Sequence, residues 1–258
     1  MKLIIPIADS DKPLITSFVS VLKHWGKQKG HDCVVITDYG EKNNIQAEYV
    51  YNEVKDLYDN CHLYIDEQFS PTGWPQGPNF YWHCTIEHLK LSDNKEPWFW
   101  IESDAYPLKK NYMDILEKEY IDSKKPFCGS ITKTYNTVLT KNLTSLEEPV
   151  EIPHHEHTTG IAIYPARVDQ HIDSWQYVND TKIAFDSFCQ YEMVPLTKHS
   201  EIFLQCYRSG SYRIENKSLK YHSRIKKKEM IKKLEDHHVI HHGCKDNTMP
   251  ILILTNQI

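Results

Sequence analysis

The stretch WFWIESDAYPL, residues Trp98–Leu108, places two carboxylates directly after one of the most apolar runs of the chain. Its first four residues predict a buried strand, which Pro97 precedes and a polar turn follows. In open α/β sheets, ligands bind in the crevice outside the carboxyl ends of the strands. Glu102 and Asp104 can reach one point at such an end, and two converging carboxylates usually need a cation. We therefore expect a metal site here, against the alternative of a solvated turn.

The segments before this stretch alternate between strand and helix patterns. Leu3–Ala8 and Cys33–Asp38 predict buried strands, and apolar residues recur at helical spacing between Leu14 and Trp25. A β-α-β order implies parallel strands joined by a right-handed crossover. With no internal repeat and no linker in the sequence, we expect one α/β domain over residues 1–258. Its Rossmann-like central sheet is expected to be mainly parallel and flanked by helices.

The remaining elements are predicted from the same patterns. The Pro- and Gly-rich run at 70–79 must be a loop, and it leads into a helix at about Phe80–Leu91 that Asn79 would cap. The later predicted elements are a helix at Asn111–Asp122, strands at Pro126–Ile131 and Gly160–Tyr164, helices at about Thr181–Met193 and Thr197–Tyr207, and a short strand at Val239–Ile240.

Composition sets the protein class. The chain is 40% apolar and 25% charged, as in ordinary globular proteins. Its seven cysteines are odd in number and show no regular spacing, and no secretory leader is apparent, so we expect reduced thiols and a cytoplasmic location. No run approaches the roughly 20 apolar residues that span a membrane.

Charge is distributed unevenly along the chain. The segment 208–233 holds ten Lys or Arg against two acids, a net charge of +8, whereas the remainder carries −13. A basic strip on an acidic body favours a face that meets phosphates, of a nucleotide, a nucleic acid or anionic lipid. The alternative is a solvated helix face whose lysines point outward.

The late run HHGCKD, His241–Asp246, is the second motif of the chain. It combines metal-competent imidazoles, a flexible Gly and a Lys. Carboxylate oxygens together with one imidazole suit Mn²⁺, and Mg²⁺ less readily. A Lys beside such a cation suits a diphosphate, because neither partner alone neutralises its charge. The alternative is surface histidine in a chain that has 15.

These motifs resemble those of GT-A glycosyltransferases, which use nucleotide sugars on a single α/β domain. Glycogenin-like retaining enzymes carry D-x-D after a central strand and a late H-x-x-G-x-x-K. The chain also resembles uncharacterised phage and bacterial glycosyltransferase-like proteins with W-x-W-x-E-x-D-A-x-P-L, H-x-x-G-[IV]-x-[IV]-Y-P and H-G-C-K-D. Here these patterns read Trp98–Leu108, His157–Pro165 and His242–Asp246. The similarity spans most of the chain, but the first acid is Glu, and Lys245 follows His242 by three residues rather than six.

The resemblance implies roles for the motif residues. Asp104 would be a direct metal ligand, and Glu102 the outer acid that contacts the metal through water or the ribose. His242, with His241 as the rival, would be the third ligand. Lys245 would hold the diphosphate.

The resemblance also implies a donor site formed by other loops. Ala8 and Asp9, which end the first strand, would lie under the nucleoside base. Asp38 would hold the ribose or an edge of the base. Trp74 and Asn79, in the loop before the helix, could line the sugar subsite.

The implied activity is metal-assisted transfer of a sugar from a nucleoside-diphosphate sugar, with UDP favoured, to an acceptor hydroxyl. An inverting enzyme needs a general base, for which Asp186 and His157 are candidates; the alternatives are a polar helix face and a packed loop residue. The favoured acceptor is phage DNA with hydroxylated bases, in the cytoplasm of the host cell. The side chains expected to contact its phosphates are Arg208, Arg213, Lys226, Lys227 and Lys228.

Other functions stay open from sequence. A cell-surface glycan or a protein hydroxyl is the alternative acceptor. A nucleotidyltransferase uses a related fold and metal dyad, but it usually has a Gly-rich basic loop after the first strand, which ADSDKP at 8–13 lacks. A non-catalytic nucleic-acid-binding module on the same fold is the third alternative.

Overall fold

The computed structural model describes residues 1–71, 73–134, 137–139, 150–152, 155–205, 214–215, 218–219, 234–243 and 247–258. Its main sheet has seven strands in the order β10-β6-β9-β4-β1-β2-β3, in which only β9 runs antiparallel to its neighbours. The strands are β1 (Lys2–Pro6), β2 (Asp32–Thr37), β3 (Cys61–Ile65), β4 (Trp98–Trp100), β6 (Phe127–Thr134), β9 (His155–Tyr164) and β10 (Thr197–His199).

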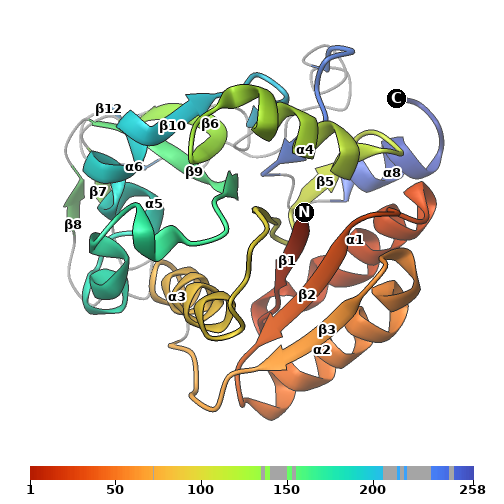
Figure 1. Cartoon of the computed structure of the whole chain (residues 1–258), viewed down its shortest axis with the longest axis horizontal. Helices are drawn as coiled ribbons and strands as arrows, with labels where there is room; N and C mark the ends of the chain where they lie inside the picture. Colours follow the sequence, from red (N-terminus) through yellow and green to blue (C-terminus); the bar gives the residue numbers. More distant parts are fainter. Residues whose placement is uncertain are drawn as a thin grey trace.

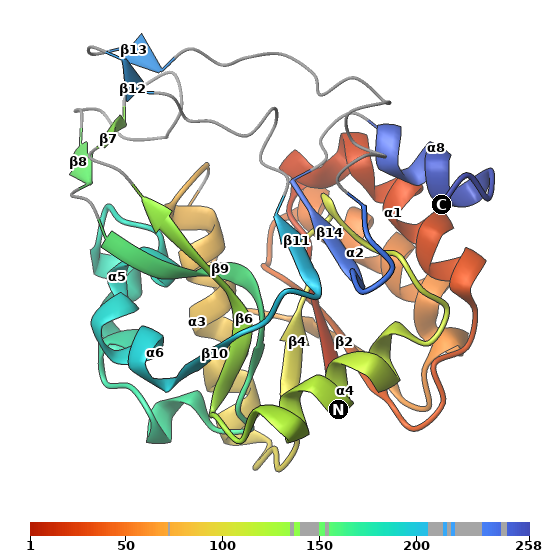
Figure 2. The same cartoon turned by 90° about the horizontal axis from the view of Figure 1, so that it is seen from above.

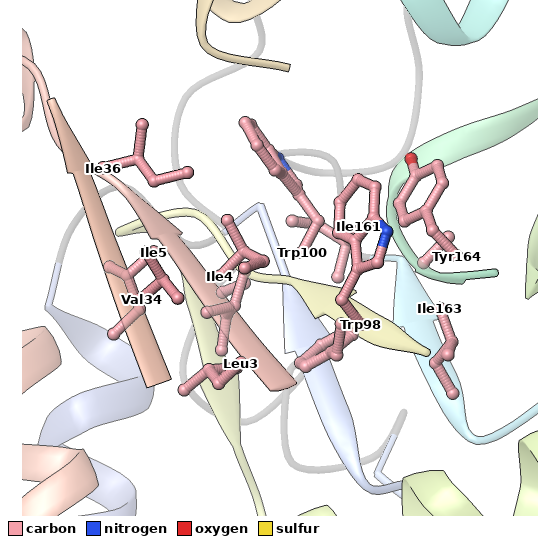
Figure 3. Packing of buried hydrophobic residues seen from close by; sticks show 14 of the residues in the cluster. Leu3, Ile4, Ile5, Val34, Ile36, Trp98, Trp100, Ile161, Ile163 and Tyr164 are labelled. Atoms are coloured by element: carbon pink, nitrogen blue, oxygen red, sulfur yellow. The ribbon is translucent and has the colours of Figure 1, made fainter. Parts of the chain in front are cut away.

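The central strands are apolar along almost their whole length because helices or loops cover both faces of the sheet. Leu3, Ile4 and Ile5 of β1 are fully buried, as are the aromatic residues of β4. Figure 3 shows β1 side chains packed between those of β2 and the indole rings of Trp98 and Trp100. This packing makes β1 and β4 the rigid centre from which the following loops extend.

Helices cover both faces of the sheet. α1 (Lys12–Trp25) and α2 (Glu41–Val54) lie on one face, and α3 (Gln76–Leu91) lies on the other (Figures 1 and 2). This is the arrangement that right-handed crossovers produce when the strand order reverses after β3. α1 ends at Gly26, whose φ of 71° opens the turn toward β2.

The other helices follow the later strands or close the chain. They are α4 (Tyr112–Ser123), α5 (Phe185–Phe188), α6 (Gln190–Leu196) and α8 (Thr248–Leu254), with 3-10 turns η1 (Asp9–Asp11), η2 (Lys55–Leu57), η3 (Val168–Gln170) and η4 (Ser174–Asp180). In the described part of the chain, no helix has both the length and the apolar character needed to cross a membrane. The cysteines described, at 33, 61, 84, 128 and 189, are free thiols.

A second sheet, in the order β11-β14-β5, joins the end of the chain to the segment that follows β4. It consists of β5 (Ala105–Pro107), β11 (Phe203–Gln205) and β14 (Ile240–His242), and Figure 2 shows β11 and β14 side by side. β14 pairs antiparallel with β5, so that His242 lies opposite Ala105. Two small ribbons pair β7 (Thr137–Leu139) with β8 (Val150–Ile152) and β12 (Ile214–Glu215) with β13 (Ser218–Leu219).

The structure confirms the expected fold class, an α/β architecture with a mainly parallel central sheet flanked by helices. The helix predicted at Thr197–Tyr207 is wrong. Thr197 opens β10, which pairs in parallel with β6, and Phe203 opens β11. Strand pairing with distant segments has overridden the local pattern.

Two further helix predictions need correction. The helix expected at Thr181–Met193 begins only at Phe185 and is split into α5 and α6. Asn79 is not an N-cap, because α3 starts three residues earlier at Gln76. The amide of Asn79 instead bonds to a distant segment, as described below.

Candidate functional site

Three potential metal ligands converge at the carboxyl end of β4. Glu102, Asp104 and His242 each offer one atom within 4.8 Å of the other two. The His242 Nε2 atom lies 3.4 Å from Asp104 Oδ1 and 3.9 Å from Glu102 Oε2. The structure therefore brings together both carboxylates of the E-S-D motif and one imidazole from a segment about 140 residues later in the chain.

The local backbone explains why these side chains meet. β4 ends at Trp100, whose indole N–H donates to Glu102 Oε1 at 3.2 Å and orients that carboxylate. Asp104 directly precedes β5, and its carbonyl accepts from the Gly243 N–H at 3.2 Å. Because β14 pairs with β5, the side chain of His242 arrives on the same side as the two acids.

The donor set fits a divalent cation. Ligands about 2.1 Å from an octahedral cation lie about 3.0 Å apart when adjacent and about 4.2 Å apart when opposite. The distances of 3.4 and 3.9 Å from His242 Nε2 to the two carboxylate oxygens fall within that range. Asp104 is only 5% exposed, and two facing carboxylates repel each other unless a positive charge lies between them. Two carboxylates and one imidazole suit Mn²⁺, or Mg²⁺.

The loop after β1 is tied to the same motif. Ser103, between the two acids, donates its hydroxyl to Asp11 Oδ1 at 2.7 Å, and Asp11 Oδ2 accepts from the Ala8 N–H at 2.8 Å. The Asp9 N–H donates to Asn43 Oδ1 at 2.6 Å. Ala8 and Asp9 thus follow the strand beside β4, at the point where the strand order reverses and where open α/β sheets bind ligands.

Asp38, which follows β2, is buried and holds several loops together. Its Oδ1 accepts from the Gly40 N–H and the Asn43 amide, and its Oδ2 accepts from the Ser70 N–H and the Tyr81 hydroxyl, at 2.7–3.1 Å. Burial opposes the charged form, but the bonds from Ser70, Asn43 and Gly40 outweigh it and lower the pKa of the carboxyl. Asp38 therefore fixes the loops beside the predicted nucleoside site.

Trp74 and Asn79 occupy different environments. Trp74 is 38% exposed in the loop before α3, whereas Asn79 is fully buried. The Asn79 amide donates to the carbonyls of Val178 and Ile183 at 2.8 and 2.9 Å, and its oxygen accepts from the Phe185 N–H at 2.7 Å. Asn79 thereby anchors the segment that carries Asp186.

The two candidate bases lie beside each other. His157 Nδ1 is 3.7 Å from Asp186 Oδ2 and 2.8 Å from the Thr158 carbonyl, to which it donates. Asp186 Oδ1 accepts from the Ser187 N–H at 2.8 Å. Burial lowers the pKa of His157, but the hydrogen bond and charge of Asp186, with the Thr158 carbonyl, raise it by more. The sequence placed these residues 29 positions apart; the structure makes them a pair.

The pair and the metal ligands approach the same stretch of β9. A Cβ built on Gly160 would meet the Phe185 ring at 3.2 Å and Glu102 Oε1 at 3.7 Å. Burial raises the pKa of the Tyr164 hydroxyl, and the charges of Asp186 and Glu102 raise it further. Gly160 therefore lies between Glu102 of the metal ligands and Phe185, the neighbour of Asp186 in the chain.

The pKa of His157 predicts a pH-dependent contribution to stability. Pairing with Asp186 stabilises the folded state fully below the ordinary histidine pKa of about 6.5, and this contribution is lost as pH rises through the higher folded pKa. The difference in unfolding free energy between wild type and His157→Gln should therefore be larger at pH 5.5 than at pH 8.5. Urea denaturation of both proteins at the two pH values measures it. A difference independent of pH would contradict the pairing.

The remaining predicted site residues lie elsewhere. His241 is fully buried on the opposite face of β14 from His242, and neither ring nitrogen has a hydrogen-bond partner. Burial and then the charge of His242 lower the pKa of His241 to about 3. Lys245 lies outside the described residues. So do the residues predicted to contact nucleic acid, namely Arg208, Arg213, Lys226, Lys227 and Lys228.

Several site residues escaped the sequence reasoning. Ser103 lies inside the E-S-D motif, and its signal is its type, since small hydroxyl residues often tie loops. Asp11 lies near the end of β1, and nothing local in the sequence indicates that it bonds to Ser103. Gln205, which contacts His242, and Thr159, which contacts Gln205, carry no sequence signal, because only the pairing of β11 with β14 brings Gln205 to the site.

Comparison with known proteins bears on the fold. No protein-family model and no curated protein sequence matches this chain. The apo structure of WbbM, a bifunctional glycosyltransferase, matches with a TM-score of 0.51 at 10% identity, over 95% of this chain and 46% of that one. Apo mouse xyloside xylosyltransferase 1 gives 0.48 at 8% identity, over 96% and 99% of the two chains. The structure of a 4-diphosphocytidyl-2C-methyl-D-erythritol synthase matches with a TM-score of 0.44 at 9% sequence identity. That match covers 78% of this chain and 89% of the synthase chain.

These likenesses concern architecture. This chain spans less than half the length of WbbM, and at 10% identity the match shows the fold alone. It confirms the Rossmann-like GT-A arrangement expected from the sequence. The sequence resemblance to phage and bacterial proteins stays a prediction.

Proposed function

We propose that this protein is a metal-dependent glycosyltransferase that moves a sugar from a nucleoside-diphosphate sugar to an acceptor hydroxyl. The observation that carries the proposal is the convergence of Glu102, Asp104 and His242 at the carboxyl end of β4. This point lies beside β1, where the strand order reverses, and the fold is GT-A-like.

The three ligands would hold Mn²⁺, or Mg²⁺, which when bound supplies Lewis-acid neutralisation of the charge on a leaving diphosphate. Asp104 and His242 would ligate directly. Glu102, the more exposed acid, would contact the cation through water or bind the donor ribose. Lys245 is proposed to donate to the diphosphate, because it follows His242 by three residues.

The donor would lie along the ends of β1 and β2. Ala8 and Asp9 would pass beneath the nucleoside, while Asp38 would keep the loops after β2 and β3 in place or hold the ribose. Trp74 would border the sugar. UDP is the favoured nucleotide.

The reaction breaks the bond from the anomeric carbon to the diphosphate oxygen, which keeps the electron pair, and forms a bond to the acceptor oxygen. In an inverting reaction, the acceptor proton passes to the pair formed by Asp186 and His157. This assignment is supported by the 3.7 Å approach of the two side chains and by their position around Gly160 with Glu102.

For the acceptor we propose a hydroxylated base of DNA. The support is the basic segment 208–233, which has a net charge of +8. Its side chains would bind the phosphate backbone and position the duplex without reading its sequence. Incubation with a radiolabelled sugar nucleotide and duplexes with or without 5-hydroxymethyl-pyrimidines tests this choice. Labelling of glycan or protein hydroxyls instead would refute DNA as the acceptor but would still support glycosyl transfer.

The proposal is tested by thermal unfolding with UDP, GDP, CDP, ADP and dTDP, each with Mn²⁺ or with chelator. A ligand at about 100 times its dissociation constant stabilises by about 2.7 kcal/mol, and hence raises Tm by roughly 5–10 °C. We expect one nucleotide to give this shift only with metal. Release of nucleoside diphosphate then indicates glycosyl transfer, whereas pyrophosphate indicates nucleotidyl transfer. No shift with any nucleotide would overturn the donor site.

A further inference from the structure

A chain of three hydrogen bonds leads from the protein interior to the imidazole of His242. The Thr159 hydroxyl donates to the Ile161 carbonyl at 3.3 Å. The Gln205 amide nitrogen donates to that hydroxyl oxygen at 3.0 Å. The Gln205 amide oxygen lies 2.7 Å from His242 Nδ1. Gln205 therefore touches a candidate metal ligand without being near enough in sequence to have been suspected.

The direction of these bonds fixes a proton. The hydrogen of the Thr159 hydroxyl is committed to a carbonyl, so its oxygen must accept, and only the nitrogen end of the Gln205 amide can donate to it. The oxygen end of that amide then faces His242. An amide oxygen can only accept, so Nδ1 of His242 carries a hydrogen. In the neutral imidazole, Nε2 is then the unprotonated nitrogen, which carries the lone pair.

The lone pair points where a cation would bind. Nε2 is the atom of His242 that lies 3.4 Å from Asp104 Oδ1 and 3.9 Å from Glu102 Oε2. The other tautomer would put a hydrogen on that atom and block ligation. The register of the small sheet sustains the arrangement, because Gln205 on β11 lies directly opposite His242 on β14.

We propose that Gln205 is a positioning residue of the metal site, which holds His242 in the tautomer and ring orientation that present Nε2 to a divalent cation. This inference rests on the proposed function, because it assigns the role of a residue behind the same three ligands. Outer partners of this kind fix the tautomer of metal-binding histidines, and losing one typically weakens metal affinity about 10- to 100-fold.

The test compares two substitutions at one position. Gln205→Leu removes the acceptor, whereas Gln205→Glu retains an acceptor for Nδ1–H although it loses the donor to Thr159. We expect Gln205→Leu to weaken Mn²⁺ binding about 10- to 100-fold, and Gln205→Glu to stay within a few fold of wild type. Titration of free Mn²⁺ by electron paramagnetic resonance measures the affinity. If both variants bind as wild type does, or if both weaken equally, the inference is overturned.

A matched control separates positioning from general stability. Gln28 is a buried glutamine whose amide donates to two backbone carbonyls, those of Gly26 and Lys110, away from the metal ligands, whereas Gln205 is partly buried. Gln28→Leu should lower the melting temperature but leave Mn²⁺ affinity unchanged. Weaker Mn²⁺ binding in Gln28→Leu, matching that of Gln205→Leu, would also overturn the inference.

A second measurement does not need the metal at all. In protein labelled with ¹⁵N-histidine, the nitrogen shifts and couplings of His242 report which ring nitrogen is protonated. Wild type should show hydrogen on Nδ1, and Gln205→Leu should show a mixture or the opposite tautomer. Failure of wild type to bind Mn²⁺ while this tautomer shift is observed would refute the proposed function and leave standing only that Gln205 sets the tautomer of His242. An unchanged tautomer in Gln205→Leu would refute the role.

Discussion

Replacing Asp104 with Asn is expected to abolish the metal-dependent thermal shift by nucleoside diphosphate and to lower kcat/KM by at least about 10²–10³-fold. The change preserves shape but removes the charge that a divalent cation requires of its ligand. Asp104 is 5% exposed and its Oδ1 lies 3.4 Å from His242 Nε2, so the substitution removes one of the two carboxylates that converge on this imidazole. The backbone carbonyl of Asp104 still accepts from Gly243, which keeps the link between β5 and β14.

The matched control is Asp169→Asn. Asp169 is also a little-exposed carboxylate, paired with Arg167 on η3. Asp169 follows the end of β9. Because Tyr164 at that end pairs with Trp98, this is the amino end of β4, opposite to the end at which the metal ligands lie. This substitution should lower stability through the lost ion pair while leaving the metal-dependent shift intact. Retention of that shift in Asp104→Asn, or its loss in both variants, would contradict the assignment of Asp104 as a ligand.

The parts of the fold that were predictable are those in which burial alone decides the structure. The apolar runs at Leu3–Ala8, Cys33–Asp38 and Trp98–Ile101 became β1, β2 and β4, with ends shifted by at most two residues. Strands buried on both faces read as continuous apolar segments, so sequence is sufficient for them. The parallel direction of β1 and β2 is predictable from the helix between them.

The parts that failed depend on distant partners. α2 was not foreseen because only Ala47, Val50 and Val54 are buried along its 14 residues, which leaves most of the helix polar. The sequence pattern at β10 predicts a helix, since nothing local reveals that Thr197 pairs with Phe127. β3 was missed because it is an edge strand with no fully buried residue.

The candidate site divides in the same way. Glu102 and Asp104 were found because strand ends and acids are visible in sequence, and His242 because a late imidazole next to Gly and Lys is a recognisable pattern. The sequence does not show that His242, rather than His241, lies beside the two acids. This placement comes from the register of β14 on β5, which turns alternate side chains to opposite faces.

The position of the two candidate bases depends on an irregularity of the sheet. β6 and β9 are out of register between Gly129 and Ile131, so that β9 carries extra residues opposite a short piece of β6. This irregularity falls between His157 and Ala162, in the stretch that approaches Glu102 and Phe185. Bulges often re-aim side chains beside active sites. The pairing of His157 with Asp186 therefore needs the fold, and no spacing rule predicts it.

Asp186→Asn is expected to lower kcat by about 10²–10⁴-fold if the reaction inverts, because a general base contributes about that much. The Asn side-chain oxygen can still accept from the Ser187 N–H, which keeps the start of α5 intact. The metal-dependent nucleotide shift and KM for the donor should stay close to wild type, since Asp186 is not among the three ligands. Initial rates of nucleoside diphosphate release, with saturating donor and acceptor, measure the effect.

Two comparisons assign the loss in Asp186→Asn to proton transfer. Asp180→Asn makes the same change on an exposed acid at the end of η4 and should leave kcat unchanged. His157→Gln should lower kcat and remove the acidic limb of the pH profile if the imidazole takes the proton. A smaller loss, with the acidic limb retained, is expected if Asp186 takes the proton directly. A kcat for Asp186→Asn within threefold of wild type would refute both assignments and favour a retaining reaction without a base at this position.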